Sequence, residues 1–241
     1  MKKTFLLFLS LFAITVFSPA FSQTVPYYFE NPEFFSSTTS ECTYPSSVNS
    51  SSKNGAVLFW QESAGSSLQI VCSSTQDGIK WSDKKVLSQD IIFSGTVPLV
   101  YSVSVNKSGT IVCAILKEEG CLEFISSRDT FASFEKSELN SENESFIAPR
   151  IFTLSNGSFI LFVSSGIDEN FGLKYSVSKD GLKWSEFSTL NTDSIKAYNP
   201  VVPFVCGGNK TDVLVFIAQH SQENHYSFQL YSSASKDGGK T

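Results

Sequence analysis

An internal repeat of about 50 residues is the feature that most constrains how this chain folds. Prolines recur in one phase, at Pro45, Pro98, Pro149 and Pro200, with spacings of 53, 51 and 51 residues. After each proline come a polar turn and an apolar run, as in Asn156-Gly157 before residues 158–162. Asn-Gly between apolar runs is the strongest short-range signal of a β-hairpin. A fixed period of this length predicts a repeat architecture built from hairpins.

Each repeat also carries an aspartate in a second turn, and the aspartates lie 52, 51 and 57 residues apart. An aspartate in such a turn can accept bonds from the turn's own backbone amides, glycine adopts positive φ without strain, and an aromatic covers the turn. We therefore expect these residues to stabilise turns rather than to perform acid–base chemistry. They are Asp77, Gly78 and Trp81, then Ser127, Asp129 and Phe134, then Ser178, Asp180, Gly181 and Trp184, then Ser235, Asp237 and Gly239.

Four strands in about 50 residues correspond to one blade of a β-propeller. The 22 Phe and 8 Tyr residues also favour strands, so we predict an all-β chain with four-stranded blades. We expect residues 23–44 to supply a strand that closes the propeller, because open sheet edges invite association. The predicted blades are residues 45–97, 98–148, 149–199 and 200–241, the last of them truncated.

The four aspartate turns resemble the Asp-box, Ser-x-Asp-x-Gly-x-Thr-Trp, of the sialidase (BNR-repeat) superfamily. The resemblance covers about residues 40 to 241. The first turn has Thr75 in place of serine, and the second has Phe131 where glycine is usual. The resemblance implies a propeller of about six blades, of which this chain holds about four, so the chain is expected to be a fragment.

The same resemblance implies a clamp of three arginines for a substrate carboxylate, an acid/base Asp and a Tyr–Glu nucleophile pair. The chain contains two arginines, Arg128 and Arg150, and Thr43 stands where the family has its first arginine. The segment expected to hold the acid/base Asp offers only Glu62. We therefore predict no catalytic residue in this chain. Arg150 is a weak ligand candidate, and a structural or surface role is the preferred interpretation of this residue.

Two functions remain open on this reasoning. The preferred one is an exported, non-catalytic propeller that binds a glycan or a protein partner. The alternative is the N-terminal part of a divergent sialidase-like glycoside hydrolase, whose remaining site residues lie in sequence not present here. Fold alone cannot decide between them, because function resides in the site.

The first 22 residues have the charged, apolar and small-residue zones of a secretory signal peptide. The apolar run is too short to span a membrane, so we expect an exported protein, periplasmic or extracellular. Removal of Lys2 and Lys3 with this leader changes the net charge from −5 to −7. Such a charge disfavours nucleic acid as a partner.

No cofactor or metal is expected from the cysteines and histidines. The five cysteines, an odd number without a CxxC pair, give no zinc pattern. A Cys113–Cys121 bridge across one hairpin is possible, but buried thiols in strands are the preferred interpretation. His220 and His225 flank Glu223 at a spacing that matches no ligand pattern, so we interpret them as solvated loop residues.

Overall fold

All the regular structure described in this chain is β-strand. The computed structural model describes residues 42–49, 55–91, 100–118, 120–141, 144–167, 170–190, 202–207, 213–220 and 228–237. Fifteen strands and no helix occur in these ranges. The described residues therefore include no helix that could cross a membrane. The all-β prediction is confirmed. The signal peptide at 1–22 and most of the expected closing segment at 23–44 lie outside the described residues.

The strands form four antiparallel sheets, which follow one another along the chain. The first sheet has the order β1 (Cys42–Asn49), β2 (Ala56–Ala64), β3 (Ser67–Thr75), β4 (Lys85–Ile91). The second has β5 (Tyr101–Val105), β6 (Ile111–Glu118), β7 (Cys121–Ser127), β8 (Glu135–Asn140). The third has β9 (Ser145–Thr153), β10 (Phe159–Ile167), β11 (Asn170–Ser178), β12 (Ser188–Thr189). The fourth has β13 (Val202–Gly207), β14 (Val213–His220), β15 (Phe228–Ser235).

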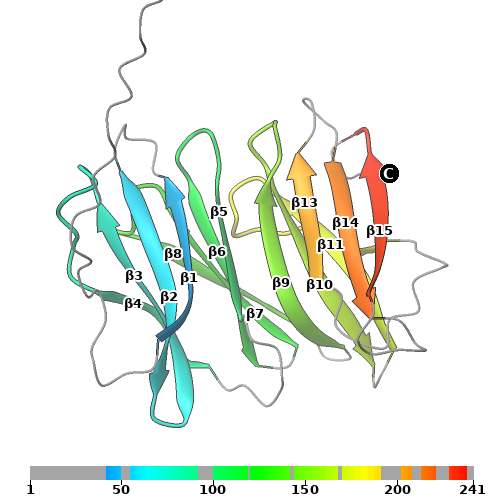
Figure 1. Ribbon diagram of the computed structural model, residues 1–241, viewed down its shortest axis with the longest axis horizontal. Helices are drawn as coiled ribbons and strands as arrows, with labels where there is room; N and C mark the ends of the chain where they lie inside the picture. Colours follow the sequence, from blue (N-terminus) through cyan, green and yellow to red (C-terminus); the bar gives the residue numbers. More distant parts are fainter. Residues whose placement is uncertain are drawn as a thin grey trace, which may run out of the picture. The chain divides into compact units, whose positions relative to one another are not determined.

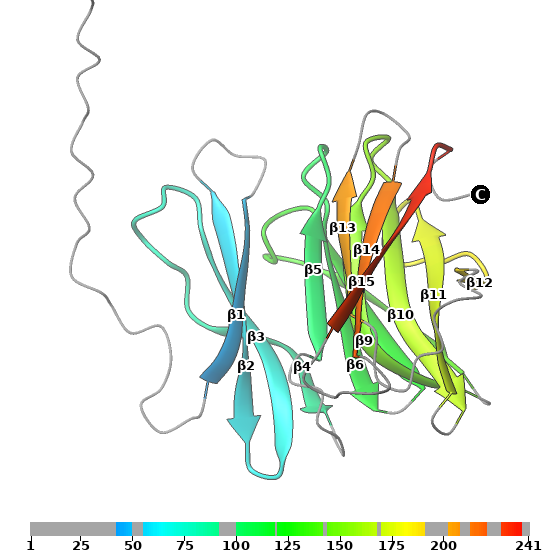
Figure 2. The ribbon, with the colours of Figure 1, turned by 45° about the vertical axis from the view of Figure 1, so that its right-hand side comes forward.

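The first strand of each sheet lies beside the first strand of the next one. β1 contacts β5, β5 contacts β9, and β9 contacts β13, so these four strands form the inner row of the assembly. Figures 1 and 2 show the sheets in this order, from the first sheet (blue to cyan) to the fourth (orange to red). Hairpin-linked four-stranded sheets with a shared inner row are the blades of a β-propeller. The predicted incomplete propeller with four-stranded blades is confirmed.

The core lies in the seams between sheets. Along β2, Val57 and Phe59 are fully buried and belong to one apolar cluster with Val112 and Phe124 of the second sheet. A smaller cluster, centred on Phe162, lies on the opposite side of the third sheet. Burying each such side chain contributes about 1.5–3 kcal/mol, so the seams supply most of the stability.

Two of the recurring prolines, Pro45 and Pro149, lie at a bulge in their inner strands. The register of β1 with β2 shifts between Thr43 and Ser46, and the register of β9 with β10 shifts at the residues that face Val163. The residues before Pro45 and Pro149 have positive φ, 53° at Tyr44 and 50° at Ala148. A bulge leaves one residue unpaired, and proline, which has no N–H, fits there without the loss of a ladder bond.

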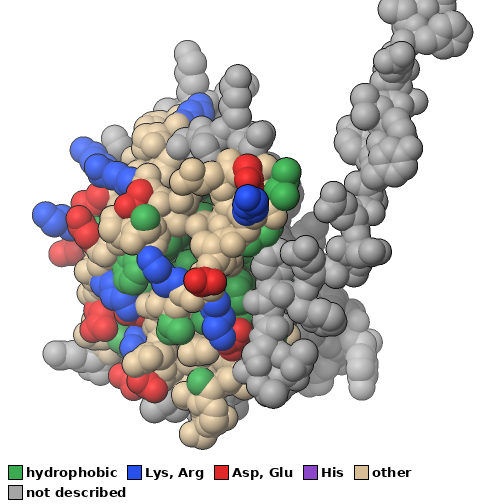
Figure 3. Space-filling model, turned by 90° about the vertical axis from the view of Figure 1, so that its left-hand side faces the viewer, with side chains coloured by type: hydrophobic (Ala, Val, Ile, Leu, Met, Phe, Trp, Pro, Cys, Tyr) green, Lys and Arg blue, Asp and Glu red, His purple; other side chains and the backbone are tan. Residues whose placement is uncertain are grey.

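The surface of the first sheet differs from that of the others. Every large hydrophobic residue that is exposed in the described part of the chain belongs to this sheet or its turn: Tyr44, Ile79 and Val86. Figure 3 views the molecule from this side, where hydrophobic side chains reach the surface among lysines and carboxylates.

Candidate functional site

The aspartates of the repeated turns are bonded within their own turns. Oδ1 of Asp77 accepts hydrogen bonds from the amides of Ile79 and Lys80, both at 2.8 Å. Oδ1 of Asp180 accepts from Leu182 and Lys183 in the same way, at 2.9 and 2.8 Å. The amides of Lys80 and Ile79 hold the pKa of Asp77 below its ordinary value. These carboxylates are therefore ionised near neutral pH and are not proton donors.

The second turn reaches the same geometry with one more residue. Asp129 accepts from the amide and the hydroxyl of Ser133, at 2.9 and 2.6 Å, and from the Ser127 hydroxyl at 2.9 Å. The amide of Phe131 bonds the Ser127 hydroxyl, as the amide of Gly181 bonds the Ser178 hydroxyl. Phe131 therefore occupies the glycine place, with φ of 65°, and its buried ring packs on Phe59 at 5.4 Å. This packing offsets the strain of left-handed backbone.

The remaining residues predicted in the turns lie as follows. Trp81 forms an isolated bridge with Thr75, and Trp184 forms one with Ser178. Trp184 also packs on Phe124 of the second sheet at 4.8 Å, and Phe134 lies 6.2 Å from Phe131. In the fourth repeat Ser235 donates to Asp237 at 2.8 Å, while Gly239 lies outside the described residues.

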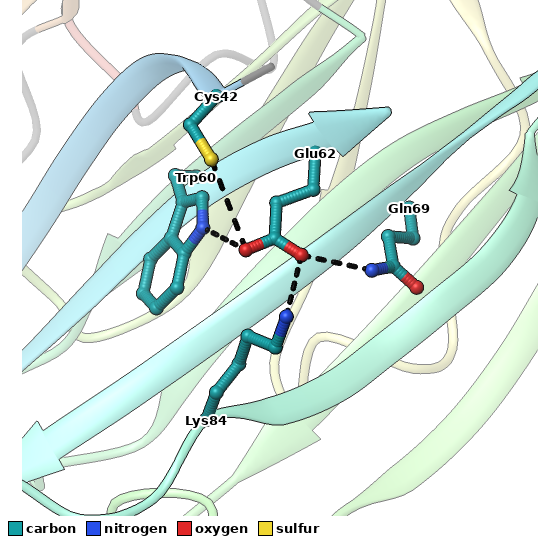
Figure 4. A network of polar contacts seen from close by, with 5 residues as sticks. All are labelled: Cys42, Trp60, Glu62, Gln69 and Lys84. Atoms are coloured by element: carbon teal, nitrogen blue, oxygen red, sulfur yellow. Dashed lines mark hydrogen bonds and ion pairs between the residues drawn. The ribbon is translucent and has the colours of Figure 1, made fainter. Parts of the chain in front are cut away.

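Glu62 is the one carboxylate in the segment where the resemblance implied an acid/base Asp. Its side chain is held in a closed network of polar contacts (Figure 4). Its side chain is fully buried and accepts bonds from Trp60 Nε1 at 2.9 Å, Gln69 Nε2 at 2.9 Å and Lys84 Nζ at 2.7 Å. Burial alone would raise the pKa of Glu62, but these donors together lower it. The Cys42 thiol also donates to this carboxylate, at 3.8 Å, and a buried, ionised carboxylate with these four donors cannot deliver a proton to a substrate.

Two further carboxylates are paired with lysine in the same manner. Lys136 bonds Glu123 at 2.9 Å in the second sheet. Lys174 bonds Glu144 in the third sheet, where Ser165 also donates to that carboxylate. The lysine and the serine hold the pKa of Glu144 below its ordinary value. Thr43, where the resemblance implied an arginine, instead accepts a bond from Gln61 at 3.5 Å.

Cys113 and Cys121 are free thiols, so a Cys113–Cys121 disulfide is wrong for this structure. In the β6–β7 hairpin Cys113 pairs with Ile125 and Cys121 with Glu118, which places the two thiols at different levels of the ladder. Burial raises the pKa of Cys72 to about 12 and raises that of Cys113 as well. The side chain of Cys206 lies outside the described residues.

No group of three His, Cys, Asp or Glu side chains suited to a metal occurs within the described ranges. Of the histidines considered above, His220 ends β14 without a described side chain. Glu223 and His225 lie outside the described residues.

A pocket of about 360 Å³ opens between the inner strands β5 and β9 and is here called the axial pocket. Arg150, which follows the β9 bulge, is half-buried in its wall, and Nη1 donates to the Pro149 carbonyl at 3.0 Å. Burial lowers the pKa of Arg150. The guanidinium has no carboxylate partner among the described residues. The rest of the wall consists of hydroxyl and apolar residues: Ser102, Val103, Ser104, Ile151, Phe152, Thr153, Leu154, Ser155 and Val213.

A larger pocket, of about 470 Å³, lies at the rim between the second and third aspartate turns. Arg128, the second arginine, lines it together with Asp129, Glu135 and Asp180. Asp129 and Asp180 are already occupied by turn amides. The rim pocket is therefore part of the turn scaffold, and the axial pocket is the better candidate site despite its smaller volume.

No protein-family model matches the chain, and no curated protein matches it. Solved structures do match its fold. An α-L-arabinofuranosidase from Fusarium graminearum, in complex with an iminosugar inhibitor, matches with a TM-score of 0.56 and 17% identity, over 82% of this chain and 63% of that one. An α-L-arabinanase from Penicillium chrysogenum, complexed with arabinobiose, matches with 0.56 and 14%, over 81% and 63%. A PL25 ulvan lyase matches with 0.57 and 10%, over 83% and 54%.

These matches define the fold as a β-propeller of the kind found in carbohydrate-active enzymes, and the chain spans less than two thirds of each of these proteins. The resemblance to the sialidase superfamily is wrong, because the structures found to be similar include an arabinofuranosidase, an arabinanase and a lyase of other families. The error has a physical cause. The aspartate turn joins two outer strands, and its residues contact one another and a neighbouring sheet. Such a motif reports turn geometry and carries no information about the site.

Proposed function

We propose that this chain is an exported, non-catalytic carbohydrate-binding propeller, and that the axial pocket holds the saccharide. The observation that carries the proposal is the pocket wall, whose described residues combine hydroxyls, one phenylalanine and one arginine and include no carboxylate. The known proteins of similar fold include an arabinanase complexed with arabinobiose. A protein partner, the other ligand class considered from sequence, finds less support, because a concave polar pocket suits a small ligand.

The hydroxyls of the wall are held in fixed positions by the strands. Ser102 Oγ accepts from the amide of Ile151 at 3.1 Å, and Ser104 Oγ lies 2.8 Å from Thr153 Oγ1. Thr153 in turn donates to the Val105 carbonyl at 3.0 Å. A hydroxyl has one proton and two lone pairs, so each can still bond a sugar hydroxyl. Pre-ordered polar groups reduce the entropy cost of binding.

Arg150 supplies the strongest donor of the pocket. A guanidinium has five N–H donors, and only one bond, to the Pro149 carbonyl, is formed with described residues. A half-buried cation has lost part of its hydration, and none of the described residues supplies Arg150 with a counter-charge, so oxygen atoms of a ligand would restore its hydrogen bonds. Phe152, held against Phe162 at 6.5 Å, gives the pocket an apolar surface for the C–H face of a sugar ring.

The non-catalytic part of the proposal rests on the carboxylates. Hydrolysis of glycosides ordinarily requires two carboxyl groups that flank the bond. The axial pocket has no Asp or Glu among its described lining, and Glu62, Glu123 and Glu144 are each paired with a lysine.

The proposal of export rests on the leader sequence, and cell fractionation with N-terminal sequencing tests it. A mature chain that starts near residue 23 outside the cytoplasm is the expected result.

The test is titration calorimetry of the full chain against arabino-oligosaccharides and uronate–rhamnose oligosaccharides. Arg150→Met should weaken binding at least about tenfold, or about 1.4 kcal/mol, while Arg128→Met, the matched rim variant, should leave it within about twofold. Failure of every saccharide to bind, or equal losses in both variants, would overturn the binding proposal. Release of reducing ends from any of the saccharides would overturn its non-catalytic part.

A further inference from the structure

Two Asn-x-Ser triplets of the sequence lie in equivalent hairpin turns. Asn106-Lys107-Ser108 belongs to the turn between β5 and β6, and Asn156-Gly157-Ser158 belongs to the turn between β9 and β10. Asn-x-Ser/Thr, with x other than proline, is the acceptor sequence for N-linked saccharides in exported proteins. Further triplets begin at Asn49, Asn143 and Asn209, and each lies wholly or partly outside the described residues. The structure therefore allows the first two triplets to be compared.

The two turns have the same backbone but place their asparagines differently. The amide of the first turn residue donates to the carbonyl of the fifth, at 3.0 Å in residues 106–110 and at 2.7 Å in residues 154–158. The glycine in the fourth place has positive φ in both turns, 82° and 87°. Asn106 is therefore the first residue of its turn, whereas Asn156 is the third residue. Ser108 stands in the second sheet at the place of Asn156, so the turn backbone does not require asparagine there.

Asn106 is built into the contact between its own turn and the next one. Its Oδ1 accepts from the amide and the hydroxyl of Ser108, at 3.1 and 2.7 Å, and from the amide of Thr110 at 3.0 Å. Its Nδ2 donates to the carbonyl of Gly157 in the third sheet at 3.0 Å. The side chain is half-buried, so a saccharide ring on this nitrogen would be pressed against the neighbouring turn.

Asn156 presents its amide to solvent. The residue is exposed, and its Nδ2 has no hydrogen-bond partner among the described residues. Its Oδ1 accepts from the amide of Ser158 at 2.9 Å, which is the local bond of an Asx turn. A Cβ added at Gly157 would meet no atom within 4 Å, so the space beside the turn is open. Substitution of Nδ2 leaves Oδ1 with its bond to Ser158, so the folded turn can carry a saccharide.

We infer that Asn156 is an N-glycosylation site, a modification that rests on the proposed export of the chain and not on ligand binding by the axial pocket. In the transfer step Nδ2 forms a bond to the anomeric carbon of a saccharide that is carried on a polyprenyl diphosphate. The bond between that carbon and the diphosphate breaks, the diphosphate leaves with the electron pair, and Nδ2 loses one of its two protons. Ser155, the neighbour of Asn156, lines the axial pocket, so the attached glycan stands beside that pocket.

The test is expression of the full chain, with its leader, in a eukaryotic cell that glycosylates exported proteins, followed by peptide mapping of the secreted protein. Treatment with peptide N-glycosidase converts a glycosylated asparagine into aspartate, which marks the site. The peptide with Asn156 should carry the glycan, and the peptide with Asn106 should not. Ser158→Ala should lower the intact mass by one glycan, whereas Ser158→Thr should keep it. Ser108→Ala, the matched removal of a hydroxyl in the equivalent turn, should leave the number of glycans unchanged.

A secreted chain in which Asn156 is unmodified would overturn the inference and leave the proposed export intact. Modification of Asn106 in place of Asn156, or a glycan that persists in Ser158→Ala, would overturn it as well. Retention of the chain in the cytosol would overturn the export and the inference together. Saccharide binding by the axial pocket is measured separately, by calorimetry, so its failure is distinguishable from each of these outcomes.

Discussion

Alanine at Gly181 and at Gly78, introduced one at a time, tests whether an aspartate turn is clamped against the preceding sheet. The backbone φ is 79° at Gly181 and 77° at Gly78, so alanine costs about 1–2 kcal/mol of strain at either position. At Gly181 the added Cβ would also lie 2.2 Å from Cγ2 and 2.9 Å from Cγ1 of Val112. Overpacking of this kind costs about 1–3 kcal/mol. The free energy of unfolding should fall by about 2–5 kcal/mol for Gly181→Ala and about 1–2 kcal/mol for the exposed Gly78→Ala.

Urea unfolding followed by tryptophan fluorescence measures both losses. A difference of about 2 kcal/mol between the variants corresponds to about 4–8 °C in melting temperature for a chain of this size. The double variant Gly181→Ala/Val112→Ala removes the obstacle, so the two substitutions should show a coupling energy of about 0.5–3 kcal/mol. Equal losses at Gly78 and Gly181, or additive effects in the double variant, would refute the idea that the third turn is seated on Val112.

Other outcomes follow from the buried polar groups. Glu62→Gln, which keeps the shape and removes the charge, should lower the free energy of unfolding at pH 7 by about 2 kcal/mol in urea titrations, and a loss below a few tenths would contradict the network. The lowered pKa of Glu62 means that its stabilisation is complete above its ordinary value of 4.5 and is lost as the pH falls through the lower folded value. The wild-type melting temperature should therefore fall more steeply than that of Glu62→Gln below about pH 4.5; parallel curves would argue against this. Asp180→Ala, which removes the acceptor of two turn amides, should cost about 1 kcal/mol, and an unchanged melting curve would count against that role. Cys72 and Cys113 should resist alkylation at pH 8 until the chain unfolds, because burial raises both pKa values; mass-spectrometric detection of either adduct in the folded protein would contradict this.

The repeat in the sequence was enough to predict the strands and sheets of the propeller. Its signals are local: an Asn-Gly turn between apolar runs specifies a hairpin without reference to distant residues. The period of the prolines was visible, but its meaning was not. A bulge at Pro149 depends on how β9 pairs with β10, which only the folded sheet shows.

The family and the site could not be predicted in the same way. The aspartate turn suggested a sialidase, yet it reflects only the local geometry of a turn. Phe131 is accommodated in the glycine place because its ring packs on Phe59 of the first sheet. The isolation of Glu62 from solvent likewise depends on Lys84 and Gln69, which reach it from other parts of the sheet. Arg150 was visible as one of two arginines, but the axial pocket is formed by strands that lie about 50 residues apart in the sequence. Contacts between repeats carry no local sequence signal.

Hydrogen exchange in the presence and absence of an arabino-oligosaccharide tests whether the axial pocket is the saccharide site. The ligand should slow amide exchange in residues 102–104 and 150–154, which line the axial pocket, and leave exchange in the rim pocket at residues 126–135 unchanged. Protection confined to the rim, or no protection at a ligand concentration far above that of the protein, would contradict it.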